Sequence, residues 1–197
     1  MPYDRALVRM RQAVAERAAD RIDDMLLLVR HPPVITVGRK RGAAESVLTP
    51  RDVPVVAVER GGDATYHGPG QLVAYPIFRL EGADRDLHRF LRRLEETVIE
   101  ALEQLGVPGE RSHGRTGVWV GGRKIASIGV AIRSWVSYHG VSLDVAPDPG
   151  FAAIRPCGMD SQVMTSLEEV LGRPVDFALV RQAWLDAFCR VFGFEQA

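Results

Sequence analysis

The sequence has few cysteines, few lysines and no excess of charge of either sign. Its 197 residues include two cysteines, Cys157 and Cys189, with no CxxC pair, so it gives no basis for a disulfide framework or a thiolate metal site. Acidic and basic residues balance at 25 each, and the net charge does not favour a nucleic-acid backbone or a membrane surface as partner. We therefore expect a reducing compartment, no nucleic acid and no membrane.

Long hydrophobic runs and targeting signals are also missing. The N-terminal segment is charged throughout, unlike a signal peptide, and no stretch approaches the ~18 apolar residues of a membrane span. No histidine pair has HxxxH or HExxH spacing, so no metal is expected, and no motif calls for a cofactor. The length favours a single domain over residues 1–197. These features predict a cytoplasmic protein that meets its substrate in solution.

The scarcity of lysine is more informative than the scarcity of cysteine. Lys40 and Lys124 are the only lysines, and the other 23 cations are arginine. A buried lysine can lose its proton, whereas arginine cannot. Lys124 precedes "IASIGV", a small and apolar segment whose packing would lower the lysine pKa and let it exchange a proton with a thiol. The alternative is a solvated cation beside a hairpin turn.

Hydrophobic periodicity predicts several elements. Helices are expected over 3–21, from Asp84 or Asp86 to Leu105 with Gly106 just past the end, after Ser166 in a capping box with Glu169, and after Asp176. Buried strands are expected over 25–30, 53–59 and 72–78, a hairpin around Gly121-Gly122, and a further strand over 134–145. The order predicts an α/β fold of the α+β type, with a mixed, largely antiparallel central sheet flanked by helices.

A glycine-rich segment, "RGGDATYHGPGQ" (60–71), is expected to be a loop with no regular element that joins two core strands. It lacks the G-K-[ST] ending of a phosphate-binding loop. Because glycine has no side chain, the backbone amides of such a segment can approach a thioester carbonyl closely. They can then donate hydrogen bonds to the oxyanion that develops on it. The alternative is a purely structural loop. Whichever holds, His67 could carry a proton, brace the chain through a hydrogen bond or lie exposed.

The segment "RPCGMD" (155–160) places a cysteine on a bend. Pro156 fixes the chain ahead of Cys157, and Gly158 leaves the sulfur uncrowded, so the thiol would become a nucleophile once a base lowers its pKa. The alternative is a buried apolar thiol, which is how we interpret Cys189 in "AFCRVF".

Taken together and in order, these segments resemble the octanoyltransferases of lipoate synthesis, the lipoate-protein ligase B family. The similarity runs through "YDRAL", "LLLVRHPPVITVGR", "RGGDATYHGPGQLVAYPI", "TGVWVGGRKIASIGVAIRSWVSYHG" and "FAAIRPCGM". It implies a fold like that of the biotin and lipoate protein ligases. It also implies transfer of octanoyl from acyl carrier protein to a lysine of lipoyl domains, in 2-oxoacid dehydrogenases and the glycine cleavage H protein, by a monomeric enzyme.

The resemblance also implies residue roles. The acyl-carrying cysteine falls on Cys157, and the lysine that acts on its thiol falls on Lys124. Substrate contacts fall on Arg60, Gly61, Gly62, Asp63, Ala64, Thr65, Tyr66, His67, Ser127, Ile128, Gly129, Gly140, Val141 and Ser142. The chain departs from the family pattern where "HGVSLD" replaces the usual "HGLALN" and "RHPPVIT" the usual "EHPPVYT".

Three other functions remain compatible with the sequence: an ATP-dependent ligase that forms an acyl-adenylate, a non-catalytic carrier-binding module, and a cysteine hydrolase. Both protein partners belong to acidic classes, so Arg39-Lys40-Arg41 and Arg92-Arg93 are candidate docking patches. The alternative for both patches is a solvated surface.

Overall fold

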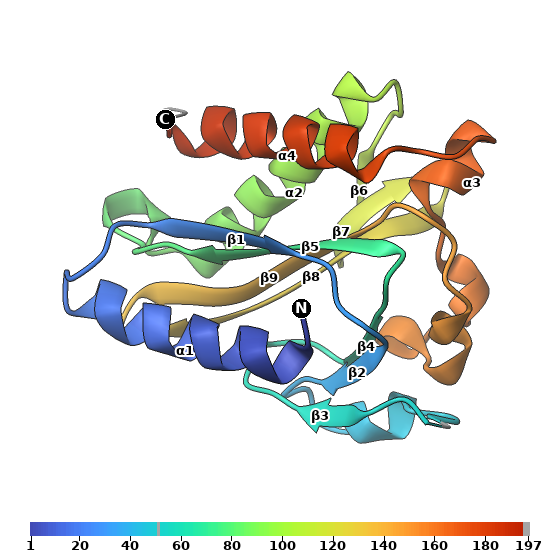
Figure 1. Cartoon of the computed structure of the whole chain (residues 1–197), viewed down its shortest axis with the longest axis horizontal. Helices are drawn as coiled ribbons and strands as arrows, with labels where there is room; N and C mark the ends of the chain where they lie inside the picture. The colour runs from blue at the N-terminus through green and yellow to red at the C-terminus, as the bar shows by residue number, and fades with distance from the viewer. Residues whose placement is uncertain (51, 195–197) are drawn as a thin grey trace.

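A six-stranded antiparallel sheet forms the middle layer of the molecule (Figure 1). The structure is a computed structural model that describes residues 1–50 and 52–194, without the side chain of Cys157. The strand order is β1-β5-β9-β8-β7-β6. The strands are β1 (Met25–Val29), β5 (Gln71–Ile77), β6 (Glu110–Ser112), β7 (Arg115–Val120), β8 (Arg123–Arg133) and β9 (Val136–Asp144).

Helices cover both faces of this sheet. On one face lie α2 (Leu87–Gln104) and α4 (Phe177–Phe192), which bury Phe90, Leu94 and Trp184 in the larger core. On the other face α1 (Tyr3–Ala18) packs on β5 and β9 through a second core that includes Met10 and Tyr75 (Figure 1). The short α3 (Leu167–Leu171) leads into α4. The arrangement confirms the predicted α/β class.

A smaller sheet lies on the α1 side of the main sheet and carries the glycine-rich segment (Figure 1). Its order is β3-β2-β4, with β2 parallel to β3 and antiparallel to β4, so the fold as a whole is mixed and largely antiparallel. The strands are β2 (Val34–Val37), β3 (Val55–Ala57) and β4 (Ala64–His67). Short 3-10 turns fill the connections: η1 (Ala43–Ser46), η2 (Gly82–Asp84), η3 (Pro149–Ala153), η4 (Pro156–Gly158) and η5 (Ser161–Val163).

The predicted helix starts agree with the structure because their caps are local, with Asp86 rather than Asp84 as the cap of α2, whereas α1 ends at Ala18 and not at residue 21. The Asp86 carboxylate accepts from the amides of His88 and Arg89 at the start of α2, and the Asp176 carboxylate caps α4. Ser166 and Glu169 form the predicted capping box. Gly106 has a φ of 77°, the left-handed conformation that suits glycine after a helix.

Three strand predictions need correction. The segment 60–71 is not without regular structure, because Ala64–His67 forms β4 by pairing with β2, and β2 itself was missed. The segment 53–59 yields only the three residues of β3, which lie largely exposed at the edge of the small sheet rather than buried. β1 is an edge strand of the main sheet and only Val29 is fully buried. Apolar runs of this length carry no information about which sheet or edge they join.

Candidate active site

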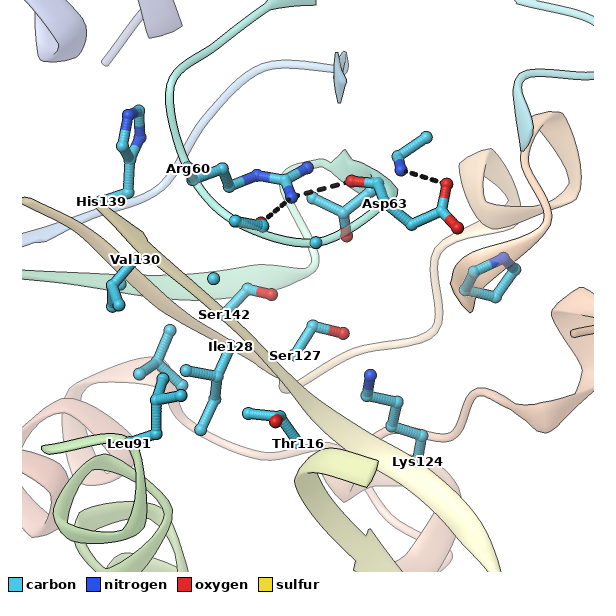
Figure 2. Close-up of a pocket in the computed structure, with 18 of the residues that line it drawn as sticks. Arg60, Asp63, Leu91, Thr116, Lys124, Ser127, Ile128, Val130, His139 and Ser142 are labelled. Atoms are coloured by element: carbon cyan, nitrogen blue, oxygen red, sulfur yellow. Dashed lines mark hydrogen bonds between the residues drawn. The ribbon is translucent and has the colours of Figure 1, made fainter. Parts of the chain in front are cut away.

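A cavity of about 490 Å³ lies between the glycine-rich segment and strands β8 and β9. Figure 2 shows Arg60 and Asp63 on one side of it and Lys124 and Ser127 on the other. The volume falls within the range of small-molecule sites. Of the predicted site residues whose side chains the structure describes, all except Tyr66 line it: Lys124, Arg60, Gly61, Gly62, Asp63, Ala64, Thr65, His67, Ser127, Ile128, Gly129, Gly140, Val141 and Ser142.

A β-bulge directs Lys124 into this cavity. β7 and β8 pair as Trp119↔Lys124 and Val118↔Ala126, which leaves Ile125 as an extra residue on β8. Ile125 and Ala126 both join the core under α2, so Lys124 and Ser127 both face the cavity although they are three residues apart. A regular strand would have sent these two side chains to opposite faces.

The Lys124 side chain is enclosed rather than solvated. It is 2% exposed, and its ammonium nitrogen lies 5.8 Å from the centre of the Trp119 ring. Gly117 provides the space: a Cβ there would lie 2.8 Å from Cε of Lys124 and 2.6 Å from the carbonyl oxygen of Ala126. The solvated-turn alternative for this lysine is therefore excluded.

The turn that contains the cysteine borders the same cavity. Residues Pro156–Gly158 form η4, and Pro156 and Met159 are lining residues together with Lys124. The amide of Arg155 donates to the carbonyl of Ser46 at 2.7 Å, which anchors the turn to η1. The side chain of Cys157 lies outside the described residues, so its contact with Lys124 stays a prediction.

A second backbone connection holds the following segment against the start of β8. The amide of Thr165 donates to the carbonyl of Lys124 at 2.9 Å, and Met164 forms an isolated parallel bridge with Lys124. The guanidinium of Arg123 donates to the carbonyl of Met164 at 2.6 Å. Thus segments about 40 positions apart in the sequence are bonded at the Lys124 end of the cavity.

The glycine-rich segment is held in shape by a buried arginine. The Arg60 guanidinium donates to the carbonyl oxygens of Thr36 and Asp63, each at 2.8 Å. The Asp63 carboxylate in turn accepts from Lys40 Nζ at 2.8 Å and from the amide of Ala64. These bonds make the segment a rigid wall, and Arg60 both lines the cavity and shapes it.

The two other predicted groups of contacts are neighbours in register. β8 and β9 pair Ser127↔Ser142, Ile128↔Val141 and Gly129↔Gly140. A side chain at Gly129 would crowd the loop, because a Cβ would lie 3.1 Å from both Cδ of Arg60 and the carbonyl oxygen of Gly61. The amide of Gly61 donates to the carbonyl of Val130 at 2.9 Å, which joins the loop to β8. The sheet therefore forms the floor of the cavity and the loop its wall.

Tyr66 is the described member of the predicted set that faces away from the cavity. It lies in β4, where alternate side chains point to opposite sides, and it packs with Ile35, Phe151 and Ile154 in a separate small core. Its hydroxyl interacts with Asp148, and its ring meets Phe151 edge-on at 5.4 Å. Tyr66 stabilises the back of the wall.

A cluster of buried histidines and tyrosines borders the cavity near α1. His67 stacks on Tyr3 with ring centres 6.0 Å apart, and His31 Nε2 lies 2.8 Å from the Tyr75 hydroxyl. Burial lowers the pKa of His67 to about 3 and those of His31 and His139 to about 4. Burial thus favours the neutral form of these histidines. His67 is hydrogen-bonded to Gln71 and is not exposed, and a role as a proton carrier stays a prediction.

Several lining residues carry no signal that single-sequence reasoning could detect. Leu91 from α2 and Val130 from β8 supply an apolar side to the cavity, close to Ile128 (Figure 2). Leu87 from α2 also lines the cavity. Tyr3, Tyr75 and Trp119 line it as well. Each of these reads as ordinary core in its own element, because the cavity is created by elements that are distant in sequence.

Among the residues that the structure describes, no group of three or more histidine, cysteine or acidic side chains is arranged to hold a metal ion. Within the same residues, no helix has the length and apolar character to cross a membrane.

Comparisons with known proteins agree with this site. Residues 2–189 match the family model of the lipoyl protein ligase A/B catalytic domain. The octanoyltransferase of Gloeobacter violaceus is 45% identical over 197 residues, covering 99% of this chain and 88% of that protein. The octanoyltransferase of Geobacter metallireducens is 47% identical over 184 residues, covering 93% of this chain and 85% of that protein.

Solved structures show the same fold at low identity. A lipoate-protein ligase A bound with ATP superposes with a TM-score of 0.77 at 18% identity, over 96% of this chain and 83% of that one. The biotin protein ligase of Aquifex aeolicus reaches 0.53 at 14% identity, over 80% of this chain and 67% of that one. The predicted biotin/lipoate protein ligase-like architecture is confirmed.

The chain belongs to the family of the lipoyl protein ligase A/B catalytic domain. Within that family it falls with the octanoyltransferases of the lipoate-protein ligase B branch, so it is an acyltransferase of protein lipoylation.

Proposed function

We propose that the protein transfers an octanoyl group from octanoyl-acyl carrier protein to a lysine of lipoyl domains through a thioester on Cys157. Lys124 takes the thiol proton, and the thiolate attacks the carrier thioester; the carrier thiolate leaves with a proton and octanoyl-Cys157 remains. The acceptor lysine then attacks this thioester, Lys124 removes the proton from the new ammonium, and the Cys157 thiol is restored. The exchange of a thioester for an amide is downhill and needs no ATP.

The observation that carries the proposal is the convergence of Lys124 and the η4 turn on one cavity. A buried lysine whose ammonium is enclosed by Trp119 and by the backbone at Gly117 is suited to proton exchange. The apolar side formed by Leu91, Ile128 and Val130 suits an alkyl chain (Figure 2). The rigid wall from Arg60 to His67 would exclude water from the thioester.

The acceptors in this proposal are lipoyl domains of 2-oxoacid dehydrogenases and the glycine cleavage H protein. Residues 1–197 would act as one catalytic domain, as a monomer in the cytoplasm. The exposed side chains of Arg39 and Arg41 flank Lys40, which lines the cavity, so a carrier protein bound there would present its thioester to the mouth. Arg92 and Arg93 are less suited to docking because their guanidinium groups are already engaged. Arg92 donates to Glu95, and Arg93 donates to Asp84 and to the carbonyl of Val191.

An ATP-dependent ligase is the second candidate, because the fold neighbours include a ligase with bound ATP. The two functions are separated by an assay with octanoyl-carrier protein and a lipoyl domain. We expect full transfer without nucleotide and no transfer from free octanoate with ATP. ATP-dependent use of free octanoate would contradict the proposal, and release of free acid faster than amide formation would identify a hydrolase instead.

A further inference from the structure

A buried carboxyl group lies beside Lys124 on the same face of the sheet. Asp144 ends β9, two residues after Ser142, whose side chain faces the cavity. Leu143 pairs with Ala126, so Asp144 lies next to the bulge that directs Lys124 into the site. Asp144 is 3% exposed. A carboxyl group in such a position interacts electrostatically with the lysine.

The hydrogen bonds of Asp144 fix which of its oxygens is engaged. Gln71 Nε2 donates to Asp144 Oδ1 at 2.8 Å and also faces the carbonyl oxygen of Tyr66, which can only accept. Gln71 Oε1 must therefore accept from His67 Nδ1, at 3.0 Å. In this series of hydrogen bonds Asp144 Oδ2 takes no part: it is buried and has no hydrogen-bond partner among the described residues. A protonated carboxyl fits this arrangement, because Oδ1 accepts in either state and Oδ2 can hold the proton.

The other charged groups that face Asp144 are Lys124 from β8, Asp148 from the start of η3 and Glu169 from α3. The Asp148 carboxylate is engaged by the amide of Gly150 and by Tyr66, and the Glu169 carboxylate by the capping box. Burial raises the pKa of Asp144 well above its ordinary value, while the charge of Lys124 acts in the opposite direction. Asp144 therefore holds its proton more readily than an exposed aspartate.

We propose that Asp144 is a positioning residue that acts through Lys124. When Asp144 is protonated, the ammonium of Lys124 pairs with the thiolate of Cys157 alone. When Asp144 is ionised, its carboxylate competes with that thiolate for the ammonium. The proton lost by the thiol goes to Lys124 Nζ in either case. Asp144 therefore adds a buried titratable group beside Lys124, which lines the cavity.

The inference rests on the proposed Cys157–Lys124 pair, and its test measures the thiol without requiring acyl transfer. The rate of alkylation of Cys157 by iodoacetamide is followed by intact mass across a pH series. A Cys189→Ser background removes the other thiol, which lies in α4 away from the cavity. Asp144→Asn keeps the acceptor for Gln71 and removes the ionisation. Asp144→Ser is the second variant if the first fails to fold.

With aspartate present, thiol and carboxyl titrate as a coupled pair, so the alkylation rate should rise over a broad pH range. In Asp144→Asn the rate should follow a one-proton curve with a midpoint lower by about one unit, which is roughly tenfold faster reaction on the rising limb. The shift should be much smaller when Lys124→Met is also present. Superimposable curves, a higher midpoint, or a uniform loss of rate at an unchanged midpoint would each overturn the inference.

The same series separates this inference from the proposed function. If Lys124→Met alone leaves the thiol midpoint unchanged, then the cysteine–lysine pair itself is refuted. If Lys124→Met raises the midpoint and Asp144→Asn does not lower it, then only the role of Asp144 is refuted.

Discussion

The Lys124 side chain occupies the space beside Gly117 across the β7–β8 pair, and a Cβ added at Gly117 would collide with both the lysine and the carbonyl oxygen of Ala126. A Cβ there would approach Cε of Lys124 to 2.8 Å and Nζ to 3.4 Å. The backbone at Gly117 also has a φ of 133°, which side chains rarely adopt. The position of the proposed base therefore depends on a residue that takes no part in the chemistry.

Gly117→Ala should reduce transfer by at least about tenfold, because a misplaced proton carrier loses much of its contribution. The strained backbone should also lower the free energy of unfolding by about 1–3 kcal/mol. Gly121→Ala is the matched control: Gly121 lies in the same hairpin with a φ of 55°, and nothing lies within 4 Å of its added Cβ. Equal activity losses in the two variants would show that strain, and not the contact with Lys124, is responsible.

Lys124→Arg tests whether the lysine supplies a base or only a positive charge. Arginine keeps the charge but does not give up its proton, so steady-state transfer should fall by about 10²–10⁴-fold. Lys40→Arg is a control for the chemical change, because Lys40 serves as an ion-pair partner of Asp63, a role that arginine can fill. Near-normal transfer by Lys124→Arg would eliminate proton transfer from the mechanism.

The buried histidines predict a loss of stability in mild acid. The folded protein keeps His31, His67 and His139 neutral down to about pH 3–4, whereas the unfolded chain protonates near 6.5. The unfolded state therefore binds more protons in this window, and the free energy of unfolding should fall as the pH falls below about 6.5. The expected slope is about 1.4 kcal/mol per pH unit for each histidine.

Urea unfolding at several pH values between about 7.5 and 5 measures this slope. His67→Asn should reduce it, whereas His113→Asn should leave it unchanged because His113 is exposed. The prediction fails if the free energy of unfolding is flat over this range, or if both variants keep the wild-type slope.

Arg39 and Arg41 are expected to attract an acidic carrier protein. Replacing both with glutamate should raise the KM for octanoyl-carrier protein severalfold at low ionic strength, with a smaller effect in high salt. Arg5→Glu with Arg9→Glu is a control of the same charge change, on the exposed face of α1. A KM that is unchanged at low salt would exclude this surface as the docking site.

Local signals in the sequence were enough to predict much of the fold. Caps at Ser166 and Asp176 act within one turn of helix and were predicted correctly, and Asp86 was one of the two caps proposed for its helix. β2 and β4 were not predicted, because each is stabilised by pairing with the other from a distance of about 30 residues. Pairing between distant short segments leaves no periodic pattern in either one.

The candidate site likewise contains features that the sequence could predict and features that it could not. Lys124 could be predicted from the rarity of lysine and from its apolar neighbours, and the structure confirms its burial. The bulge at Ile125 and the contact with Gly117 could not be predicted, since they depend on the register between β7 and β8. Tyr66 shows the converse: it belongs to a segment that forms the wall, but strand alternation directs its side chain to the other side.

The covalent intermediate is the central claim, and intact-mass measurement after mixing with octanoyl-carrier protein tests it most directly. We expect the mass to rise by one octanoyl group, neutral hydroxylamine to remove the increment, and addition of a lipoyl domain to discharge it. The Cys157→Ser variant should show no such increment and no transfer, while Cys189→Ser should behave as the wild type. Transfer at the wild-type rate by Cys157→Ser, or an adduct that persists in hydroxylamine, would contradict the account.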